Sequence, residues 1–498
     1  MLSHLTYQAI AMIIYMVAMI LIGLLAYNRT NDLDDYMLGG RTLGPIVAAL
    51  SAGAADMSGW LLMGLPGALY LNGLIEAWIA VGLTIGAWFN WKLVAPRLRA
   101  YSQIAKNSIT IPSFLGSRLH DSSQLIRLVS GVIILVFFTF YVSSGMVSGG
   151  TFFESSFGMD YHLGMVIVAG IVIVYTLMGG FLAVSWTDVV QGLMMLIALV
   201  LVPLVGIMHL GGAAELISAI KAVDPTILSP THGSLKAASL IGIISALAWG
   251  LGYFGQPHII VRFMALRSIK EAKQARRIGI AWMIFSILGA GMTALVGVAV
   301  YQHDKALLPN EESVFISLGQ LLLHPLIAGF ILAAILAAIM STISSQLLVT
   351  SSALVEDIYR VFYKKELKSN DGILLGRIAV ALVSIVAAIL AWGRSDTILA
   401  LVAFAWAGFG GSFGPVVLLS LYWKKLSVPG AICGMIAGAA TVALWGNMSG
   451  GIFDIYEILP AFIINFVVCI LVSKLTYKKN EALDQEFDQS LEELKNLR

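Results

Sequence analysis

The sequence is poor in charge and in cysteine, and it has no paired metal-binding side chains. Lys, Arg, Asp and Glu form 12% of the 498 residues, and the net charge is only +2. So small a basic surplus argues against a nucleic-acid-binding surface. Both cysteines, Cys433 and Cys469, lie inside apolar segments, which argues against a disulfide framework or a thiolate metal site. The eight histidines are scattered without His-x-x-x-His spacing.

Apolar residues, in contrast, are abundant. They make up 59% of the chain, and the mean hydropathy of +0.89 is far above that of a soluble globular protein. A helix needs about 20 apolar residues to cross a bilayer, and runs of that length recur about thirteen times. The first run lacks a basic n-region and an A-x-A-type cleavage site, so we expect a retained helix. The runs lie at about 7–27, 44–70, 74–95, 125–150, 161–180, 189–210, 237–258, 277–301, 326–355, 373–393, 397–423, 428–446 and 456–475.

The distribution of basic residues predicts the orientation of the chain in the plasma membrane. Lysine and arginine gather in the loops after spans three, seven, nine and eleven, whereas the alternate loops 151–162 and 447–456 contain neither. By the positive-inside rule, the N-terminus is outside and the C-terminus is cytoplasmic. We expect the tail, residues 476–498, to form a short amphipathic helix in solvent or on the membrane surface. The basic residues are Lys92, Arg97, Arg99, Lys106, Arg118, Arg127, Arg262, Arg267, Lys270, Lys273, Arg276, Arg277, Arg360, Lys364, Lys365, Lys368, Lys424 and Lys425.

An aspartate lies in the middle of the second span. Asp56 is the only charge between residues 45 and 70, and four glycines and Pro66 surround it. A carboxylate at the centre of a bilayer costs on the order of 3 kcal/mol, so it persists where it faces a cavity and a cation or partner. The glycines predict a broken helix, and broken backbone at this depth must line protein or water. The segment therefore predicts an ion site.

A second interrupted span follows at residues 237–258. Gly250, Gly252, Gly255 and Pro257 interrupt its apolar run. Close helix packing also uses small residues, so either span alone is weak evidence. Two Gly/Pro-interrupted spans in corresponding places of two halves are typical of a secondary-transporter binding site. The offset of five spans is odd, so the two halves must be inverted relative to each other.

Six long motifs resemble the sodium:solute symporter family, and most closely its sodium/proline branch. The resemblance covers nearly the whole chain and implies an all-α, LeuT-type integral membrane fold. It implies one polytopic transporter domain, residues 1–475, with an extra first helix and inverted five-helix repeats at about 44–210 and 237–423. Two further helices then occupy about 428–475. The motifs are DDYMLGGRTLGP (34–45), SAGAADMSGWLLMGLPGA (51–68), GGFLAVSWTDVVQ (179–191), WGLGYFGQPHIIVRFMA (249–265), ILAAIMSTISSQLLV (335–349) and AWAGFGGSFGPVVL (405–418).

Adjacent hydroxyls in span nine are candidates for a sodium site. Na⁺ takes about five or six oxygen ligands, which unwound carbonyls and hydroxyls can supply. Ser341 and Thr342 lie side by side in an apolar helix, although such hydroxyls commonly bond to the carbonyl one turn earlier. The family resemblance implies that the ligands are the carbonyls of Ala54, Met57 and Ala338 and the hydroxyls of Ser341 and Thr342. It places Asp56, Ser58 and Gly59 beside them, and we expect Asp56 to tune the site and not to bind the ion directly.

Two further charged residues have alternative interpretations. Asp188, at the start of span six, is either a helix N-cap or part of the ion exit route. The family resemblance implies an influence on sodium affinity or release. Arg41, at the cytoplasmic end of span two, is either an interfacial anchor or a gating residue for coupling.

Aromatic residues near the span centres predict the substrate site. Aromatic walls suit an apolar pyrrolidine ring and its secondary ammonium, and a helix N-terminus suits the carboxylate of proline. A sugar pocket would need many Asn, Gln, Glu and Lys side chains, which these spans nearly lack. The candidates for substrate binding are Trp60, Tyr141, Trp249, Tyr253 and Gln256.

The sequence therefore predicts a sodium-coupled symporter that imports L-proline by alternating access and functions as a monomer. It shows no triad, zinc or phosphate-binding pattern, so an enzyme is not expected. A channel would need a continuous polar pore, which is not evident. The remaining alternatives are another small solute (betaine, pantothenate or another amino acid), H⁺ or Li⁺ as the coupling ion, and a membrane sensor on the same helices.

Overall fold

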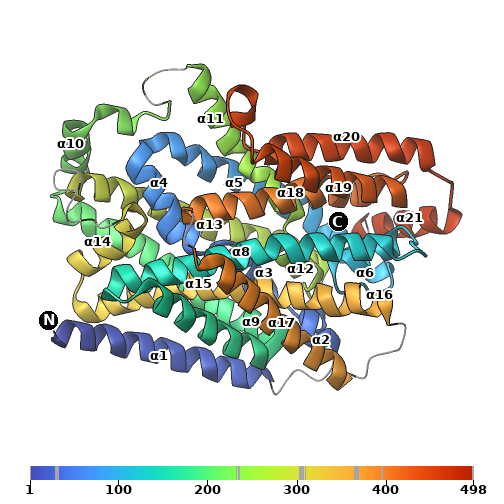
Figure 1. The fold of residues 1–498 in the computed structure, drawn as a ribbon, viewed down its shortest axis with the longest axis horizontal. Coiled ribbons are helices and arrows are strands. Elements are labelled where there is room, and N and C mark those ends of the chain that lie inside the picture. Colours follow the sequence, from blue (N-terminus) through green and yellow to red (C-terminus); the bar gives the residue numbers. More distant parts are fainter. Residues whose placement is uncertain are drawn as a thin grey trace.

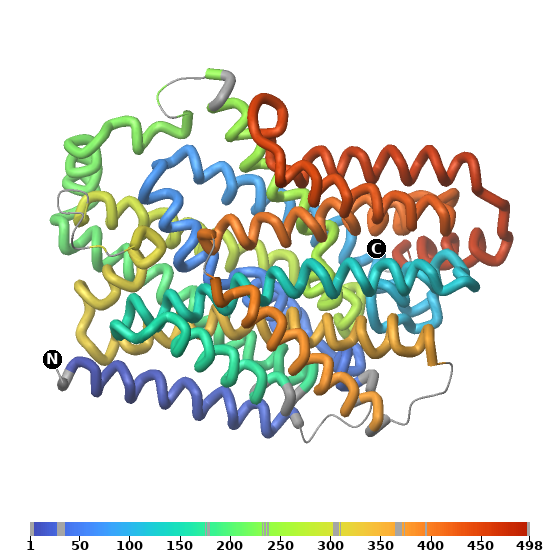
Figure 2. Tube along the Cα trace, viewed as in Figure 1, coloured from blue at the N-terminus to red at the C-terminus, as the bar shows by residue number. Residues whose placement is uncertain are grey.

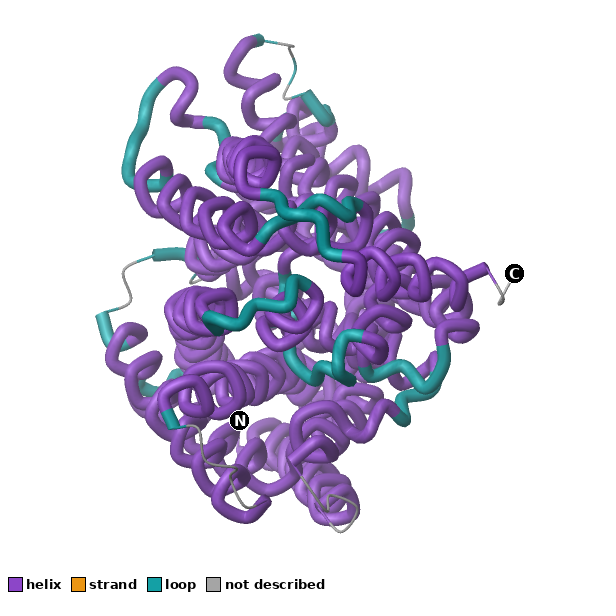
Figure 3. The backbone as a smooth tube through the Cα atoms, turned by 90° about the vertical axis from the view of Figure 1, so that its right-hand side faces the viewer, coloured by secondary structure: helices purple, strands orange, loops and turns teal. Residues whose placement is uncertain are grey.

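The computed structural model describes residues 2–27, 33–231, 233, 236–301, 308, 310–363, 369–393 and 396–495, and Figure 2 draws the rest in grey. Within these ranges the backbone is helical and contains no strand (Figure 3). Lys364, Lys365 and Lys368, which contributed to the predicted orientation, lie outside the described residues.

The helices follow the apolar runs of the sequence, with short helices between them. Two of the short ones, α10 and α14, lie at the end of the bundle where α1 begins, whereas α21 lies toward the opposite end (Figure 1). The helices are α1 (Leu2–Tyr27), α2 (Leu33–Leu38), α3 (Pro45–Asp56), α4 (Leu65–Asn72), α5 (Ala77–Phe89), α6 (Ala95–Ile104), α7 (Ile111–Arg118), α8 (Leu125–Phe157), α9 (Tyr161–His209), α10 (Ala213–Val223), α11 (Ala237–Ala248), α12 (Pro257–Met264), α13 (Ala272–Tyr301), α14 (Val314–Leu322), α15 (Pro325–Ser352), α16 (Arg360–Phe362), α17 (Ser369–Ala391), α18 (Ile398–Tyr422), α19 (Val428–Trp445), α20 (Ile458–Thr476) and α21 (Glu481–Lys495).

Fewer helices satisfy the length and hydropathy of a membrane span than the sequence predicts. Among the described residues ten helices do so, or eleven if the bent pair 239–255 and 257–264 counts as one span. The number is lower because α3 has only 12 residues and because residues 60–104 form one continuous helical stretch, with π-helical and 3₁₀ segments within it. Helix α9 also bends at Gly180, whose φ of 57° and ψ of −159° are not helical, and this bend separates the predicted spans 161–180 and 189–210.

Both predicted helix breaks are present. Helix α3 ends at Asp56, and Met57 leaves the helical region with φ −83° and ψ 82° before the helical turn η2 (Trp60–Gly64) begins. Helix α11 continues into the 3₁₀ segment η6 (Trp249–Gly255), then breaks at Gln256 and restarts as α12. Glycine is required in η6, since a Cβ on Gly252 would lie 1.9 Å from the indole nitrogen of Trp406. The glycines thus permit both the break and the close approach of α18.

Helix α15 lies at the centre of the bundle and packs against α1, α8, α9 and α3 (Figure 1). Almost every side chain between Ile331 and Leu348 of this helix is at most 3% exposed. The first break therefore lies against the most buried of the candidate membrane spans among the described residues. Helix α3 also packs on α9, α13 and α12, while η6 packs on α18 and α5.

The C-terminal helix differs from the expectation of a helix in solvent or on the membrane surface. Helix α21 packs on α6, where the ring of Phe487 meets Tyr101 edge to face at 6.0 Å and is only 4% exposed. Asp488 forms an ion pair of 2.7 Å with Lys424, and Oε1 of Glu486 lies within hydrogen-bond distance, 3.0 Å, of Nε2 of His120. The apolar stripe of the tail is thus covered by the protein itself, a pairing that the local sequence pattern does not specify.

Candidate functional site

Oxygen atoms from two distant helices meet at the break after α3. The hydroxyl of Ser341 donates to the carbonyl of Ala54 over 2.8 Å and to that of Ala338 over 3.1 Å. The hydroxyl of Thr342 also reaches the Ala54 carbonyl, at 3.3 Å. All four residues are buried, and Met57 follows at the end of α3. Hydroxyl and carbonyl oxygens without a formal charge, gathered at a helix end, suit a hard monovalent cation that must also be released.

Asp56 lies beside these oxygens and bonds elsewhere. Its Oδ2 accepts a hydrogen bond from the hydroxyl of Tyr253, and its Oδ1 has no hydrogen-bond partner among the described residues. Its main-chain carbonyl accepts the indole N–H of Trp60 at 3.1 Å. The side chain is 3% exposed. Asp56 therefore connects the break in α3 to η6, the other broken segment, through the hydroxyl of Tyr253.

Ser58 and Gly59 form the turn between α3 and η2. The Ser58 hydroxyl accepts the backbone N–H of Trp60 at 3.3 Å, and the Ser58 N–H donates to the Asp56 carbonyl at 3.1 Å. A Cβ on Gly59 would lie 2.7 Å from the hydroxyl oxygen of Ser148. These contacts hold the unwound segment against α8, so both residues position the break.

Four aromatic rings line up beside Asp56. The centroids of Trp60 and Trp249 lie 6.4 Å apart, and Trp249 lies 6.5 Å from Trp406. Trp406 meets Tyr253 edge to face at 5.1 Å. The fifth aromatic, Tyr456, lies 5.2 Å from Trp249. Such a wall fits an apolar ring with a positive charge.

Trp406 and Tyr456 were not among the predicted substrate residues. Trp406 fixes the wall, because its indole N–H donates to the Trp249 carbonyl at 2.8 Å and its own carbonyl accepts the Gln256 side chain at 3.0 Å. The motif AWAGFGGSFGPVVL contains Trp406, which was a signal that could have identified it. Tyr456 precedes α20 and lies outside every motif, so sequence reasoning had no signal for it.

Buried polar atoms without partners cluster near this wall. Among the described residues they include the hydroxyl of Tyr141, Oε1 of Gln256 and both ring nitrogens of His258. Tyr141 and His258 meet edge to face at 5.7 Å. A buried polar group left unpaired costs about 1–3 kcal/mol, so such a group is expected where a ligand supplies the missing bond. His258 was missed because a lone histidine after a break carries no pattern of its own.

Asp188 is not a helix N-cap, contrary to one of its two interpretations. It lies within α9, and its Oδ2 accepts the Ser51 hydroxyl at 2.6 Å and lies 3.3 Å from Nη2 of Arg262. Arg262 also donates to the Ser51 hydroxyl at 2.9 Å and to the Ser345 hydroxyl at 2.7 Å. Ser51 lies about one turn before Ala54, and Ser345 one turn after Ser341. A fully buried ion pair thus adjoins the oxygen cluster on one side.

Arg41 is held by the protein, which does not fit a role as an interfacial anchor. Its guanidinium donates to Oδ1 of Asn107 at 2.9 Å, the Ser102 hydroxyl at 3.0 Å, and the carbonyls of Met264 and Ser108, both at 2.7 Å. Leu43 nearby forms a short parallel bridge with Leu266. These contacts join the start of α3 to the end of α12 and to the segment after α6, an arrangement that suits a gating residue.

The chain is similar to known proteins over most of its length. The model of the sodium:solute symporter family matches residues 36–438. The high-affinity proline transporter PutP of Bacillus subtilis is 58% identical over 471 residues, covering 94% of this chain and 98% of its own. The osmoregulated proline transporter OpuE of the same organism is 53% identical, with 94% and 95% covered. A sodium/proline symporter of Staphylococcus aureus is 50% identical, with 97% and 95% covered.

Solved structures give the same fold. A substrate-bound, outward-open Na⁺-coupled sialic acid symporter superposes with a TM-score of 0.79 at 21% identity, covering 95% of this chain and 99% of its own. Mhp1, a nucleobase-cation-symport transporter, gives a TM-score of 0.53 at 13% identity, with 92% and 99% covered. The chain thus shares the helical fold of these two transporters, and it belongs to the sodium:solute symporter family.

Proposed function

We propose that this protein is a secondary active symporter that imports L-proline together with Na⁺ by alternating access. The observation that carries the proposal is the meeting of the Ala54 carbonyl with the Ser341 and Thr342 hydroxyls at a helix break, next to an aromatic wall. Proline transporters at 50–58% identity over nearly the whole chain support proline as the solute.

The sodium ion is held by five protein oxygens. These are the carbonyls of Ala54, Met57 and Ala338 and the hydroxyls of Ser341 and Thr342. Hydrogen bonds already bring together the oxygens of Ala54, Ala338, Ser341 and Thr342, which supports this set of ligands. A small cation can take the place of those hydrogen bonds and bind the same oxygens. Asp56, Ser58, Gly59 and Asp188 tune the affinity of the site and do not bind the ion directly.

Proline binds against the aromatic wall. Trp60, Trp249 and Tyr253 cover the pyrrolidine ring, and their faces stabilise its ammonium. Tyr141 and Gln256 supply polar contacts through atoms that lack partners among the described residues. The hydrogen bond between Tyr253 and Asp56 places the solute directly beside the ion.

Coupling follows from the shared break in α3. Na⁺ joins Ala54 on α3 to Ser341 on α15 and so orders the segment that carries Asp56 and Trp60. An ordered segment favours the substrate site, and by linkage proline raises the affinity for Na⁺ by the same factor. One Na⁺ moving inward at 100 mV and a tenfold gradient supplies about 3.7 kcal/mol, enough for roughly a 500-fold proline gradient at one-to-one stoichiometry.

The finer architecture is part of the proposal. Thirteen spans place the N-terminus outside and the C-terminus in the cytoplasm, with inverted repeats at about 44–210 and 237–423 and a monomer as the functional unit. The breaks in α3 and at Gln256 support the two repeats, since they occupy corresponding spans. The start of α1 and helix α21 lie toward opposite ends of the bundle, which supports the odd number of spans (Figure 1).

Uptake into proteoliposomes tests the proposed function. Labelled proline should accumulate transiently when an inward Na⁺ gradient is imposed, and an equal K⁺ gradient should not support it. Excess unlabelled betaine or pantothenate should compete poorly. Equal proline uptake in Na⁺ and K⁺ would refute sodium coupling, and stronger competition by another solute would replace proline as the cargo.

A further inference from the structure

The segment between α6 and α7, residues 105–110, bonds to residues that flank the two helices of the ion site, α3 and α15. We call it the 105–110 loop. On one side Arg41, which precedes α3, donates to the carbonyl of Ser108 at 2.7 Å and to Oδ1 of Asn107 at 2.9 Å. Arg41 also bonds the carbonyl of Met264 at the end of α12. The loop is therefore fixed to the ends of both broken spans.

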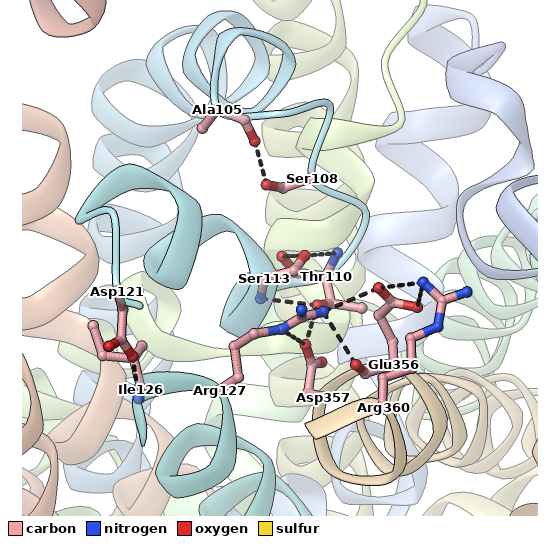
Figure 4. A network of polar contacts seen from close by, with 10 residues as sticks. All are labelled: Ala105, Ser108, Thr110, Ser113, Asp121, Ile126, Arg127, Glu356, Asp357 and Arg360. Carbon is pink, nitrogen blue, oxygen red and sulfur yellow. Dashed lines mark hydrogen bonds and ion pairs between the residues drawn. The ribbon is translucent and has the colours of Figure 1, made fainter. Parts of the chain in front are cut away.

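On its other side the loop bonds to the end of α15. The hydroxyl of Thr110 donates to Oδ1 of Asp357 at 3.1 Å, and Nε of Arg127 reaches the same oxygen at 3.1 Å. Arg127 also pairs with Glu356 at 3.0 Å (Figure 4). Asp357 is fully buried and lies in η10 (Ala353–Tyr359), a π-helical segment that extends α15. Segments of this kind are frequent at functional sites.

The loop is strained and covers a small cavity. Lys106 and Asn107 have φ values of 54° and 49°, a conformation that persists only when surrounding contacts hold it. Beneath Ile109 and Thr110 a cavity lies between α12, which contributes Val261, and α15 with its π-helical extension, which contribute Val349 and Ala353. Val349 and Ala353 follow Ser341 along α15 and its extension, and Ile111 of α7 also lines the cavity. The cavity therefore lies between the Ala54–Ser341 oxygens and the face of the protein that carries α7.

From these contacts we propose that the 105–110 loop is a latch that closes the inner path from the ion site. It ties the start of α3 and the end of α12, through Arg41, to the end of α15, through Asp357. Those elements cannot separate at this face while both attachments hold. The latch concerns the same ion path and so rests on the proposed function and orientation, which make this face cytoplasmic.

The contact with Asp357 is the part that releases. Arg41 attaches the loop to the start of α3 and the end of α12 through several charge-assisted hydrogen bonds. The attachment to Asp357 consists of one hydrogen bond from the hydroxyl of Thr110. A single hydrogen bond to a charged group is the weaker attachment, so it breaks first when α15 moves. Arg127 stays with Asp357 and Glu356, which keeps their charges paired after the loop leaves.

A cysteine beneath the loop tests the latch without measuring transport. Val261 is 5% exposed and lines the cavity, so Val261→Cys serves as the reporter in a background with Cys433→Ala and Cys469→Ala. Inside-out vesicles are treated with a membrane-impermeant maleimide. Thr110→Val and Asp357→Asn should each raise the labelling rate by about tenfold, because each removes or weakens the one hydroxyl–carboxylate bond.

Thr110 has a second role that requires a control. Its hydroxyl also caps α7 by accepting the Ser113 N–H, and the Ser113 hydroxyl accepts the Thr110 N–H in return, both at 3.0 Å. Ser113→Ala removes one half of this capping box and leaves the Asp357 contact, so its labelling rate should match the parent. Thr110→Ser keeps the hydroxyl, so its labelling rate should be as slow as that of the parent. The latch is refuted if both test variants label like the parent, or if Ser113→Ala labels as fast as Thr110→Val.

Transport then shows whether the latch acts on the proposed path. An opened latch depopulates the state that binds external Na⁺, so Thr110→Val should raise the external Na⁺ concentration for half-maximal uptake by about tenfold. If the variants label faster but the parent protein shows no Na⁺-driven proline uptake, the result would support the latch and reject proline as the cargo. Accelerated labelling with unaltered Na⁺ dependence would show that the cavity lies off the path and would overturn the assignment.

Discussion

The Ser341 hydroxyl donates to the Ala54 carbonyl over 2.8 Å, although 287 positions separate the two residues in the chain. One lies on the central helix α15 and the other on α3, just before its break. In the proposed function, a cation bound between them connects these two helices.

Removing the hydroxyls on α15 should weaken Na⁺ binding. Ser341→Ala and Thr342→Val each delete one oxygen ligand, and a contact with a charged group is worth about 1.5–3 kcal/mol, so the Na⁺ concentration for half-maximal uptake should rise at least about tenfold. Thr350→Val is the matched control, because among the described residues that hydroxyl bonds only the Gln346 carbonyl of its own helix, at 2.7 Å. Similar effects in Thr342→Val and Thr350→Val would remove Thr342 from the site.

Neutralising Asp56 should impair Na⁺ dependence without abolishing the fold. Asp56→Asn keeps an acceptor for the Tyr253 hydroxyl but removes the buried negative charge beside the ion. We expect the Na⁺ requirement of proline uptake to increase by at least about tenfold, which corresponds to a loss of about 1.4 kcal/mol of attraction between the buried carboxylate and the ion. Unaltered Na⁺ dependence would leave Asp56 with a structural role only.

Truncation of the aromatic wall should affect proline more than sodium. Trp249→Ala removes the ring that contacts Trp60, Trp406 and Tyr456. Loss of aromatic coverage and of its attraction for a cation should weaken proline binding by about tenfold to a hundredfold. Equilibrium binding of labelled proline to the purified protein, measured at several Na⁺ concentrations, separates the two affinities. A larger change in the affinity for Na⁺ would place the solute elsewhere.

The buried pair of Asp188 and Arg262 should show strong coupling in stability. Their side chains are 0% and 1% exposed, so removing one partner leaves an unpaired charge in the interior. Asp188→Asn or Arg262→Gln alone should destabilise the protein by about 3–5 kcal/mol, and the double variant should recover most of that loss. Thermal unfolding in detergent measures the cycle. Additive losses would show that the two charges do not depend on each other.

Much of the site follows from local sequence patterns, and the rest depends on long-range packing. The glycines around Asp56 and Gln256 predicted both breaks, and the Ser341 and Thr342 pair indicated the oxygen cluster. The contact of Asp188 with Arg262 could not be predicted, because hydropathy does not specify which helix faces which. The same holds for Tyr456 at the aromatic wall and for Phe487, which packs on Tyr101.

The count of spans shows where hydropathy alone is insufficient. Thirteen apolar runs are visible in the sequence, yet α3 is only 12 residues long because its helix ends at Asp56. A run of apolar residues predicts that a segment lies inside the membrane. It does not predict the length of the helix in that segment, which depends on where the backbone bends. Those bends, at Met57 and Gly180, are also where the chain leaves regular helix geometry.

Reciprocal coupling gives the most direct test of the central claim, that Na⁺ at the Ala54–Ser341 contact and proline move together. Proteoliposomes with equal Na⁺ on both sides are given an inward gradient of proline, and the uptake of radioactive Na⁺ is followed. We expect proline to drive Na⁺ inward. The Ser341→Ala, Thr342→Val double variant should lose this Na⁺ flux while it remains folded. Na⁺ movement that is indifferent to the proline gradient would contradict the central claim.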